Sequence, residues 1–180
     1  MIIMKIVMQW RQLISIMKVA LFFLSTFILL GSCELQPNYE VVEAPQEIRE
    51  KAYTIAQFYI GMEYEWGGQT HWSSKGVDCS GLIVNAFKEA LAGTPYKLPY
   101  DDAAVVNLLN SHTVPVQEPK KGDLVFMGVE EITHVALLEK IENNTVYFID
   151  AYSNSGVVEY RSYALTNEKI KQIMRHVVWY

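Results

Sequence analysis

The spacing of apolar residues changes near the segment "EPKKGD" (118–123), and this change restricts the possible fold more than any other feature. Before it, apolar side chains recur at helical spacing, most clearly in 46–61 and 79–92. After it come short runs rich in Val, Ile, Phe and Tyr, separated by turns that contain Gly or Asn. Helices followed by strands are typical of an α+β domain rather than of an alternating α/β fold.

The helical half of the chain predicts two main helices and a shorter third helix. Pro45 opens the first helix and Gly61 ends it, whereas the second begins at Cys79 and stops before Gly93. The third helix follows Pro99. In the second half, the runs "DLVFM", "HVALLEKI", "TVYFIDAY" and "GVVEYRSY" predict an antiparallel meander, and "RHVVWY" adds a strand. We therefore expect helices packed on an antiparallel sheet of about five strands.

The N-terminal part of the chain has the features of an export signal. Val19–Leu30 contains twelve residues without a charge, fewer than the roughly 20 needed to span a bilayer but enough for the apolar centre of a secretory signal. The following "LLGSC" resembles the lipobox of bacterial lipoproteins, which implies cleavage before Cys33 and lipid on its sulfur and new amino terminus. An ordinary signal peptide or an uncleaved anchor is the alternative. Because "MKVALFF" makes a compact signal by itself, we expect translation to start at Met17.

This interpretation divides the chain into a signal peptide (1–32), a lipid-anchored linker (33–45) and a folded domain (46–180). It places the protein in the cell envelope, anchored by lipid to the outer membrane or the periplasmic face. Removing 1–32 takes away three basic and no acidic residues, which leaves 12 basic and 20 acidic side chains and a formal charge of −8. So acidic a chain is a poor candidate for binding nucleic acid. We expect a monomer.

Cys79 would be the only free thiol of such a lipidated chain, and it lies where the second helix is predicted to begin. A helix N-terminus favours the thiolate form of cysteine, and its free N–H groups can stabilise an oxyanion. A small buried residue is the alternative interpretation of Cys79. Catalysis would also need a base, and His134 opens a predicted core strand, where it could face the helix start. His71 and His112 are predicted to lie in solvated loops, and His176 to be structural.

Four segments together resemble the NlpC family of bacterial cell-wall cysteine peptidases: "YEWGG…GVDCSGLI", "KKGDLVFM", "THVALLE" and "VYFIDAYS". The resemblance covers roughly 46–162 and implies a papain-like core, with Cys79 as the nucleophile and His134 as the general base. The family's third catalytic residue is commonly another histidine. Here the matching strand places Asp150 in that role, which is a departure, although a carboxylate can also orient the imidazole and stabilise its cation. A structural Asp150 at a strand end remains the alternative.

The resemblance also assigns residues around the nucleophile. Tyr64 would line the site and support the oxyanion, and the additional "THWSS" (70–74) would reshape the rim of the pocket. Asp78 and Ser80 would bind the free amine of a substrate stem peptide, or cap the helix, or do both. No histidine pair with ligand spacing, CxxC motif or glycine-rich phosphate loop occurs in the sequence, so we expect no metal and no cofactor.

The predicted function is hydrolysis of peptidoglycan stem peptides through a thioester, at the bond between D-γ-glutamyl and the diamino acid. Two alternatives remain open. The first is an envelope binding protein whose papain-like pocket is catalytically inactive. The second is an amidase or acyltransferase that applies the same Cys-His chemistry to another substrate.

Overall fold

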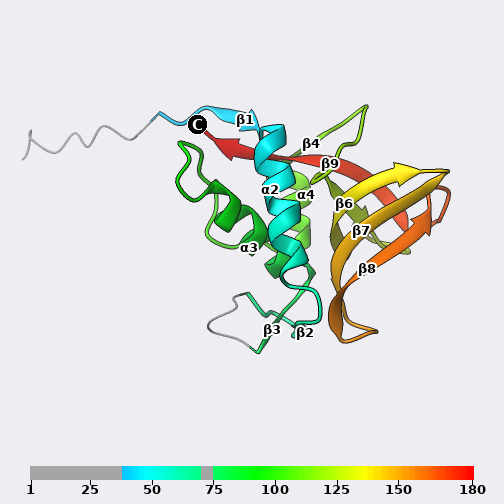
Figure 1. Cartoon of the computed structure of the whole chain (residues 1–180). Coiled ribbons are helices and arrows are strands. Elements are labelled where there is room, and N and C mark those ends of the chain that lie inside the picture. Colours follow the sequence, from blue (N-terminus) through cyan, green and yellow to red (C-terminus); the bar gives the residue numbers. More distant parts are fainter. Residues whose placement is uncertain (1–37, 70–74) are drawn as a thin grey trace, which may run out of the picture. The chain divides into compact units, whose positions relative to one another are not determined.

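In the computed structural model, which describes residues 38–69 and 75–180, two helices lie against one face of a curved sheet (Figure 1). Helix α2 (Gln46–Gln57) packs against α3 (Cys79–Leu91), and both contact strands of the sheet. The short helix α4 (Val105–Ser111) also packs on α3. The folded unit spans Tyr39–Tyr180. Within the described part of the chain, no helix is long and apolar enough to cross a membrane.

Five strands form the main part of the sheet and correspond to the five predicted runs. Their bounds are β5 (Leu124–Met127), β6 (His134–Glu142), β7 (Thr145–Tyr152), β8 (Val157–Ala164) and β9 (Ile170–Trp179). The strands β5 to β8 pair in sequence order as an antiparallel meander, and β9 returns to pair with β5. The predicted α+β class, with helices packed on a sheet whose main strands are antiparallel, is therefore confirmed.

Four further strands extend the sheet to nine among the described residues, so the expected number of about five was too low. These strands are β1 (Val41–Glu43), β2 (Glu63–Tyr64), β3 (Gly76–Val77) and β4 (Thr113–Pro115). Segments of two or three residues are too short to carry a periodicity, which is why the sequence did not reveal them. β1 pairs with β9, so a segment that the sequence placed in the linker belongs to the sheet.

Both faces of the central strands are buried. Leu124, Phe126 and Leu137 belong to the core that the helices cover. Alternate residues of the same strands form a second cluster, made of Val125, Met127, Ala136, Leu138, Val146 and Phe148. Ile170 and Ile173 of β9 pack against this second cluster. Burial on both faces explains why these strands read as continuous apolar runs rather than as alternating ones.

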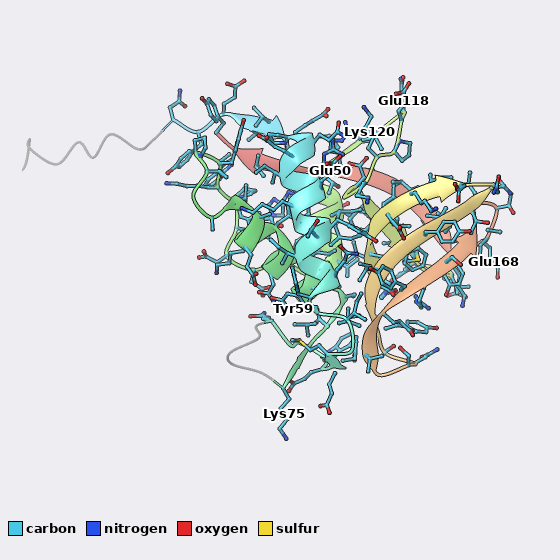
Figure 2. The ribbon with its side chains drawn as sticks, in the orientation of Figure 1. Glu50, Tyr59, Lys75, Glu118, Lys120 and Glu168 are labelled. Atoms are coloured by element: carbon cyan, nitrogen blue, oxygen red, sulfur yellow. The ribbon has the colours of Figure 1, made fainter. Side chains whose placement is uncertain are left out.

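A buried ion-pair cluster joins α2 to the sheet. Asp123, immediately before β5, is fully buried and accepts a hydrogen bond from Arg49 Nη1 at 2.9 Å. Arg175 of β9 donates to both carboxylate oxygens, at 3.0 and 3.1 Å. The aspartate of the "GDL" motif therefore holds together three elements that are distant in sequence. By contrast, Glu118 and Glu168 lie on turns at the outer edge of the domain (Figure 2).

Candidate active site

Cys79 is the first residue of α3, and Asp78 caps this helix. Asp78 Oδ1 accepts hydrogen bonds from the Gly81 N–H at 2.7 Å and from the Ser80 hydroxyl at 2.9 Å. Its other oxygen accepts a bond from the N–H of Gly67 at 3.0 Å. One carboxylate thus fixes both the helix start and the preceding loop, and the predicted capping role of Asp78 is confirmed.

The first turn of α3 lies directly against that loop. A Cβ added at Gly81 would lie 2.2 Å from the carbonyl oxygen of Gly68, which is far closer than any van der Waals contact. Gly67 has φ of +72°, a left-handed conformation that glycine adopts without strain. These glycines allow the loop to approach the helix N-terminus, and Cys79 is 7% exposed there.

His134 lies between Cys79 and Asp150. Its Nε2 is 2.5 Å from Asp150 Oδ2, so Nδ1 is the ring nitrogen left to face the thiol. Burial of the ring lowers the pKa of His134, but hydrogen bonds to Asp150 and to Cys79 outweigh this effect and raise the pKa to about 9. The imidazole is therefore protonated at neutral pH in this arrangement, and the carboxylate of Asp150 provides its counter-charge.

Arg161 of β8 fixes the carboxylate of Asp150, and sequence reasoning did not identify this residue. Arg161 Nε donates to Asp150 Oδ1 at 3.0 Å, and Nη2 donates to Oδ2 at 2.6 Å. The guanidinium lies 3.4 Å from the centroid of the Tyr152 ring. Asp150 is fully buried, so this bidentate contact satisfies a charge that water cannot reach. Only the register of β7 against β8 brings the two residues together, and the sequence does not specify that register.

A cavity of about 400 Å³ opens beside Cys79. The predicted residues Tyr64, Asp78 and Ser80 line it together with the cysteine. The rest of its wall comes from Trp66, Gly67, Gln69, Asp102, Ala103, Ala104, Val105, Val106, Ile132 and Thr133. Burial raises the pKa of Tyr64, and the charges of Cys79 and Asp78 raise it further, so its hydroxyl keeps its proton and remains a donor. The cavity therefore combines a thiol, a helix N-terminus and a phenolic donor.

The other histidines lie apart from this constellation. His176 is fully buried and stacks on Phe87 at 4.3 Å between ring centroids, which agrees with the structural role predicted for it. Burial lowers its pKa to about 3, so the ring is neutral. The prediction for His112 was wrong, because its ring is half-buried against Tyr100 rather than solvated. It immediately follows α4, where local packing decides exposure.

Several predictions concern segments that the structure does not describe. The signal peptide, Cys33, His71 and the "THWSS" segment all lie outside the described residues. In residues 38–69 and 75–180, no group of three or more His, Cys, Asp or Glu side chains is arranged to hold a metal ion.

Solved structures similar to this chain share its fold. A lipoprotein-like NLP/P60 protein from Staphylococcus aureus matches with 22% identity and a TM-score of 0.53, over 75% of this chain and 43% of that protein. NlpC2 from Trichomonas vaginalis matches with 21% identity and a TM-score of 0.55, over 74% of this chain and 49% of that one. The chain thus spans less than half the length of either protein.

A third structure is RipD from Mycobacterium tuberculosis, described as a non-catalytic NlpC/p60 domain protein adapted to binding peptidoglycan. It matches with 22% identity and a TM-score of 0.50, over 73% of this chain and 98% of RipD. No curated protein matches the sequence significantly.

The family model of NlpC/P60 matches residues 61–177, which is most of the folded unit and confirms the resemblance found in the sequence motifs. Proteins of this family are generally associated with the cell envelope, and RipD is described as adapted to binding peptidoglycan. The match includes the helix that begins at Cys79 and the strands that carry His134 and Asp150. The chain belongs to the NlpC/P60 family.

Proposed function

We propose that this protein is a cysteine peptidase that hydrolyses peptidoglycan stem peptides, with Cys79, His134 and Asp150 as its catalytic residues. The single observation that carries this proposal is the position of His134, which contacts the thiol on one side and a buried, Arg-bound carboxylate on the other. A structural histidine would not need a carboxylate fixed in this way, whereas a general base does.

The reaction proceeds through a thioester. The thiolate of Cys79, whose proton is held by His134, attacks the carbonyl carbon of the scissile amide, and an S–C bond forms while the carbonyl oxygen becomes an oxyanion. Backbone N–H groups at the start of α3 and the hydroxyl of Tyr64 donate to that oxygen. The imidazolium of His134 then protonates the nitrogen as the C–N bond breaks. Neutral His134 next takes a proton from water, which attacks the thioester and releases the acid and the thiolate.

The family resemblance and the residues beside Cys79 support a proposal for the substrate bond. We propose cleavage between D-γ-glutamyl and the diamino acid, with the acyl side of the stem peptide in the 400 Å³ cavity. Asp78 presents a carboxylate to that cavity, and Ser80 lies beside it. A free amine on the acyl segment would pair with the Asp78 carboxylate, so this residue would both cap the helix and bind substrate.

The experiment that tests this proposal compares the purified full chain with Cys79→Ala on isolated muropeptides. New amines should appear with the parent only, at the diamino acid, while circular dichroism shows both proteins folded. A binding protein without catalysis is the second candidate, favoured by the similarity to RipD, which is described as non-catalytic. Muropeptide binding without any release of amines would support that candidate and contradict the peptidase.

An amidase or acyltransferase with the same residues is distinguished in the same assay. In one outcome, the parent turns over simple esters and other amides while Cys79→Ala does not, and muropeptides remain intact. That result would support Cys79 as the nucleophile but contradict the stem peptide as the substrate. Equal turnover by the parent and by Cys79→Ala would exclude Cys79 as the nucleophile.

We also propose that Cys33 carries lipid that holds the protein to the envelope membrane, which places the domain next to peptidoglycan. Cys33→Ser should shift the protein from the membrane fraction to the soluble envelope fraction and remove the acyl mass from the mature N-terminus. Retention of Cys33→Ser in the membrane fraction, with the same N-terminal mass as the parent, would contradict lipid attachment.

A further inference from the structure

A second cavity includes His134 in its wall, and neither the sequence motifs nor the family assignment gives it a role. It measures about 170 Å³. His134, Arg161 and Lys169 contribute its cationic groups, and Tyr152 and Tyr163 contribute aromatic rings. The remaining wall consists of Met127, Gly128, Val129 and Thr133. Thr133 also lines the larger cavity at Cys79, so the two cavities meet beside His134.

The register of the sheet explains how Lys169 reaches this place. Met127 of β5 pairs with His134 on one side and with Ile170 of β9 on the other. Lys169 immediately precedes Ile170, and its carbonyl accepts a hydrogen bond from the N–H of Gly128 at 2.9 Å. The end of β5 and the starts of β6 and β9 therefore lie together, and they bring Lys169 close to His134. Glu168, the residue before it, lies at the outer edge of the same turn (Figure 2).

The charge of this cavity is opposite to that of the protein. The chain carries a formal net charge of −5, yet no Asp or Glu lines the cavity. Asp150 accepts bonds from both His134 and Arg161 and offsets part of their charge. Lys169 Nζ lies 5.8 Å from the centroid of the Tyr163 ring, and no ion pair involves this amine within the described residues. Because Lys169 has no acidic partner among the described residues and lies beside Arg161, whose charge is only partly neutralised by Asp150, the cavity favours the binding of an anion.

The guanidinium of Arg161 retains donors that can face such an anion. A guanidinium has five N–H groups. In Arg161, Nε and Nη2 each donate one hydrogen bond to Asp150, and Nη1 donates one to the hydroxyl of Tyr163. Each terminal nitrogen carries a second N–H, and the fork of a guanidinium matches the two oxygens of a carboxylate. A volume of 170 Å³ corresponds to roughly five or six water molecules, enough for a carboxylate and a short stem but too small for a sugar ring.

We propose that this cavity binds a carboxylate of the substrate fragment that leaves with the amine. This inference rests on the proposed function, because that mechanism makes His134 protonate the departing nitrogen and so places the leaving fragment on the histidine's side. The cavity at Cys79 then holds the acyl segment, and the cavity formed by Arg161 and Lys169 holds the carboxylate end of the diamino acid segment. Lys169 selects substrates whose leaving fragment ends in a free acid.

The test uses the full chain and two matched stem peptides, whose leaving fragments end in a free carboxylate or in a carboxamide. The parent should cleave the free acid with a kcat/KM about tenfold higher than the amide, a ratio worth about 1.4 kcal/mol. In Lys169→Glu that preference should vanish or reverse. Lys171→Glu makes the same change of charge two residues further along, at an exposed side chain outside the cavity, and should keep the preference of the parent.

Equal cleavage of the acid and the amide by the parent, or an unchanged ratio in Lys169→Glu, would overturn the inference. If the parent cleaves neither peptide, the proposed peptidase function fails, and binding decides the inference separately. In that case the diamino acid–D-alanine dipeptide and its amide are titrated into the parent and Lys169→Glu and followed by NMR. Tighter binding of the free acid that depends on Lys169 supports the anion site, and its absence excludes the site.

Discussion

The carboxylate of Asp150 binds two cations, His134 and Arg161, and the charge of the His134 imidazole depends on this carboxylate. It is fully buried and accepts hydrogen bonds from His134 and from Nε and Nη2 of Arg161. Because Arg161 holds this carboxylate in place, the imidazolium of His134 gains a fixed counter-charge. This counter-charge is the physical support for the proposed role of Asp150 as the third catalytic residue.

Asp150→Asn should remove that counter-charge while keeping the size of the side chain. In the parent, kcat/KM should fall as the pH rises through about 9, because His134 then loses the proton that the leaving amine needs. In Asp150→Asn the pKa of His134 should drop, so this alkaline limb should move to lower pH, and the maximal kcat/KM should fall about 100-fold or more. A pH profile of kcat/KM measures both effects.

The matched control for this change is Glu142→Gln, which neutralises an exposed carboxylate at the far end of β6. It should leave the profile unchanged. An alkaline limb at the same pH in the parent and in Asp150→Asn would contradict the role given to this carboxylate.

Asp78 combines two roles that one substitution can separate. Asparagine caps helices about as well as aspartate, so Asp78→Asn should preserve the stability of α3. It removes the negative charge from the cavity, so KM should rise about tenfold for stem peptides with a free amine on the acyl segment, with little change in kcat. The measurement compares KM for stem peptides whose acyl segment carries a free or an acetylated amine, in the parent and in Asp78→Asn. If the ratio of these two KM values is the same in both proteins, Asp78 only caps the helix and does not bind the amine.

The first turn of α3 and the glycine loop act as one structural element. Gly81→Ala would place a Cβ 2.2 Å from the carbonyl oxygen of Gly68, so the helix start or the loop must move. Because Cys79 lies in that turn, we expect kcat to fall at least about tenfold, together with a lower melting temperature. Lys88→Ala, at an exposed position of the same helix, should change neither quantity. Parent-like kcat in Gly81→Ala would show that the tight contact does not position the thiol.

The elements show how far the sequence alone could lead. The helix that begins at Cys79 and the strand that begins at His134 were predictable, because apolar periodicity and local start signals specify each of them. The pairing of Asp150 with Arg161 was not, because the register of β7 and β8 brings them together. The burial of Arg49 was also missed, since a basic residue on a helix normally indicates a solvated face. Its partner Asp123 lies in another element and is known only from the fold.

The whole domain depends on the cluster around Asp123, which connects α2, β5 and β9. Asp123→Leu would leave Arg49 buried without its carboxylate, and removing one partner of a buried pair costs about 3–5 kcal/mol. Urea unfolding should show this loss, whereas kcat should stay near that of the parent at temperatures where the variant is folded. Glu142→Gln breaks the exposed pair with Lys140 and should change stability little. If Asp123→Leu lowered the free energy of unfolding as little as Glu142→Gln does, the stabilising role given to the cluster around Asp123 would be contradicted.

The two cavities meet at Thr133, next to His134, and the functions proposed for both depend on the protonation state of His134. The most direct measurement is an NMR pH titration of its imidazole nitrogens in the folded chain, assigned by comparison with His134→Gln. We predict a midpoint near pH 9, with the proton on Nε2 directed to Asp150 throughout. A midpoint near 6.5, the value of an unperturbed histidine, would contradict it.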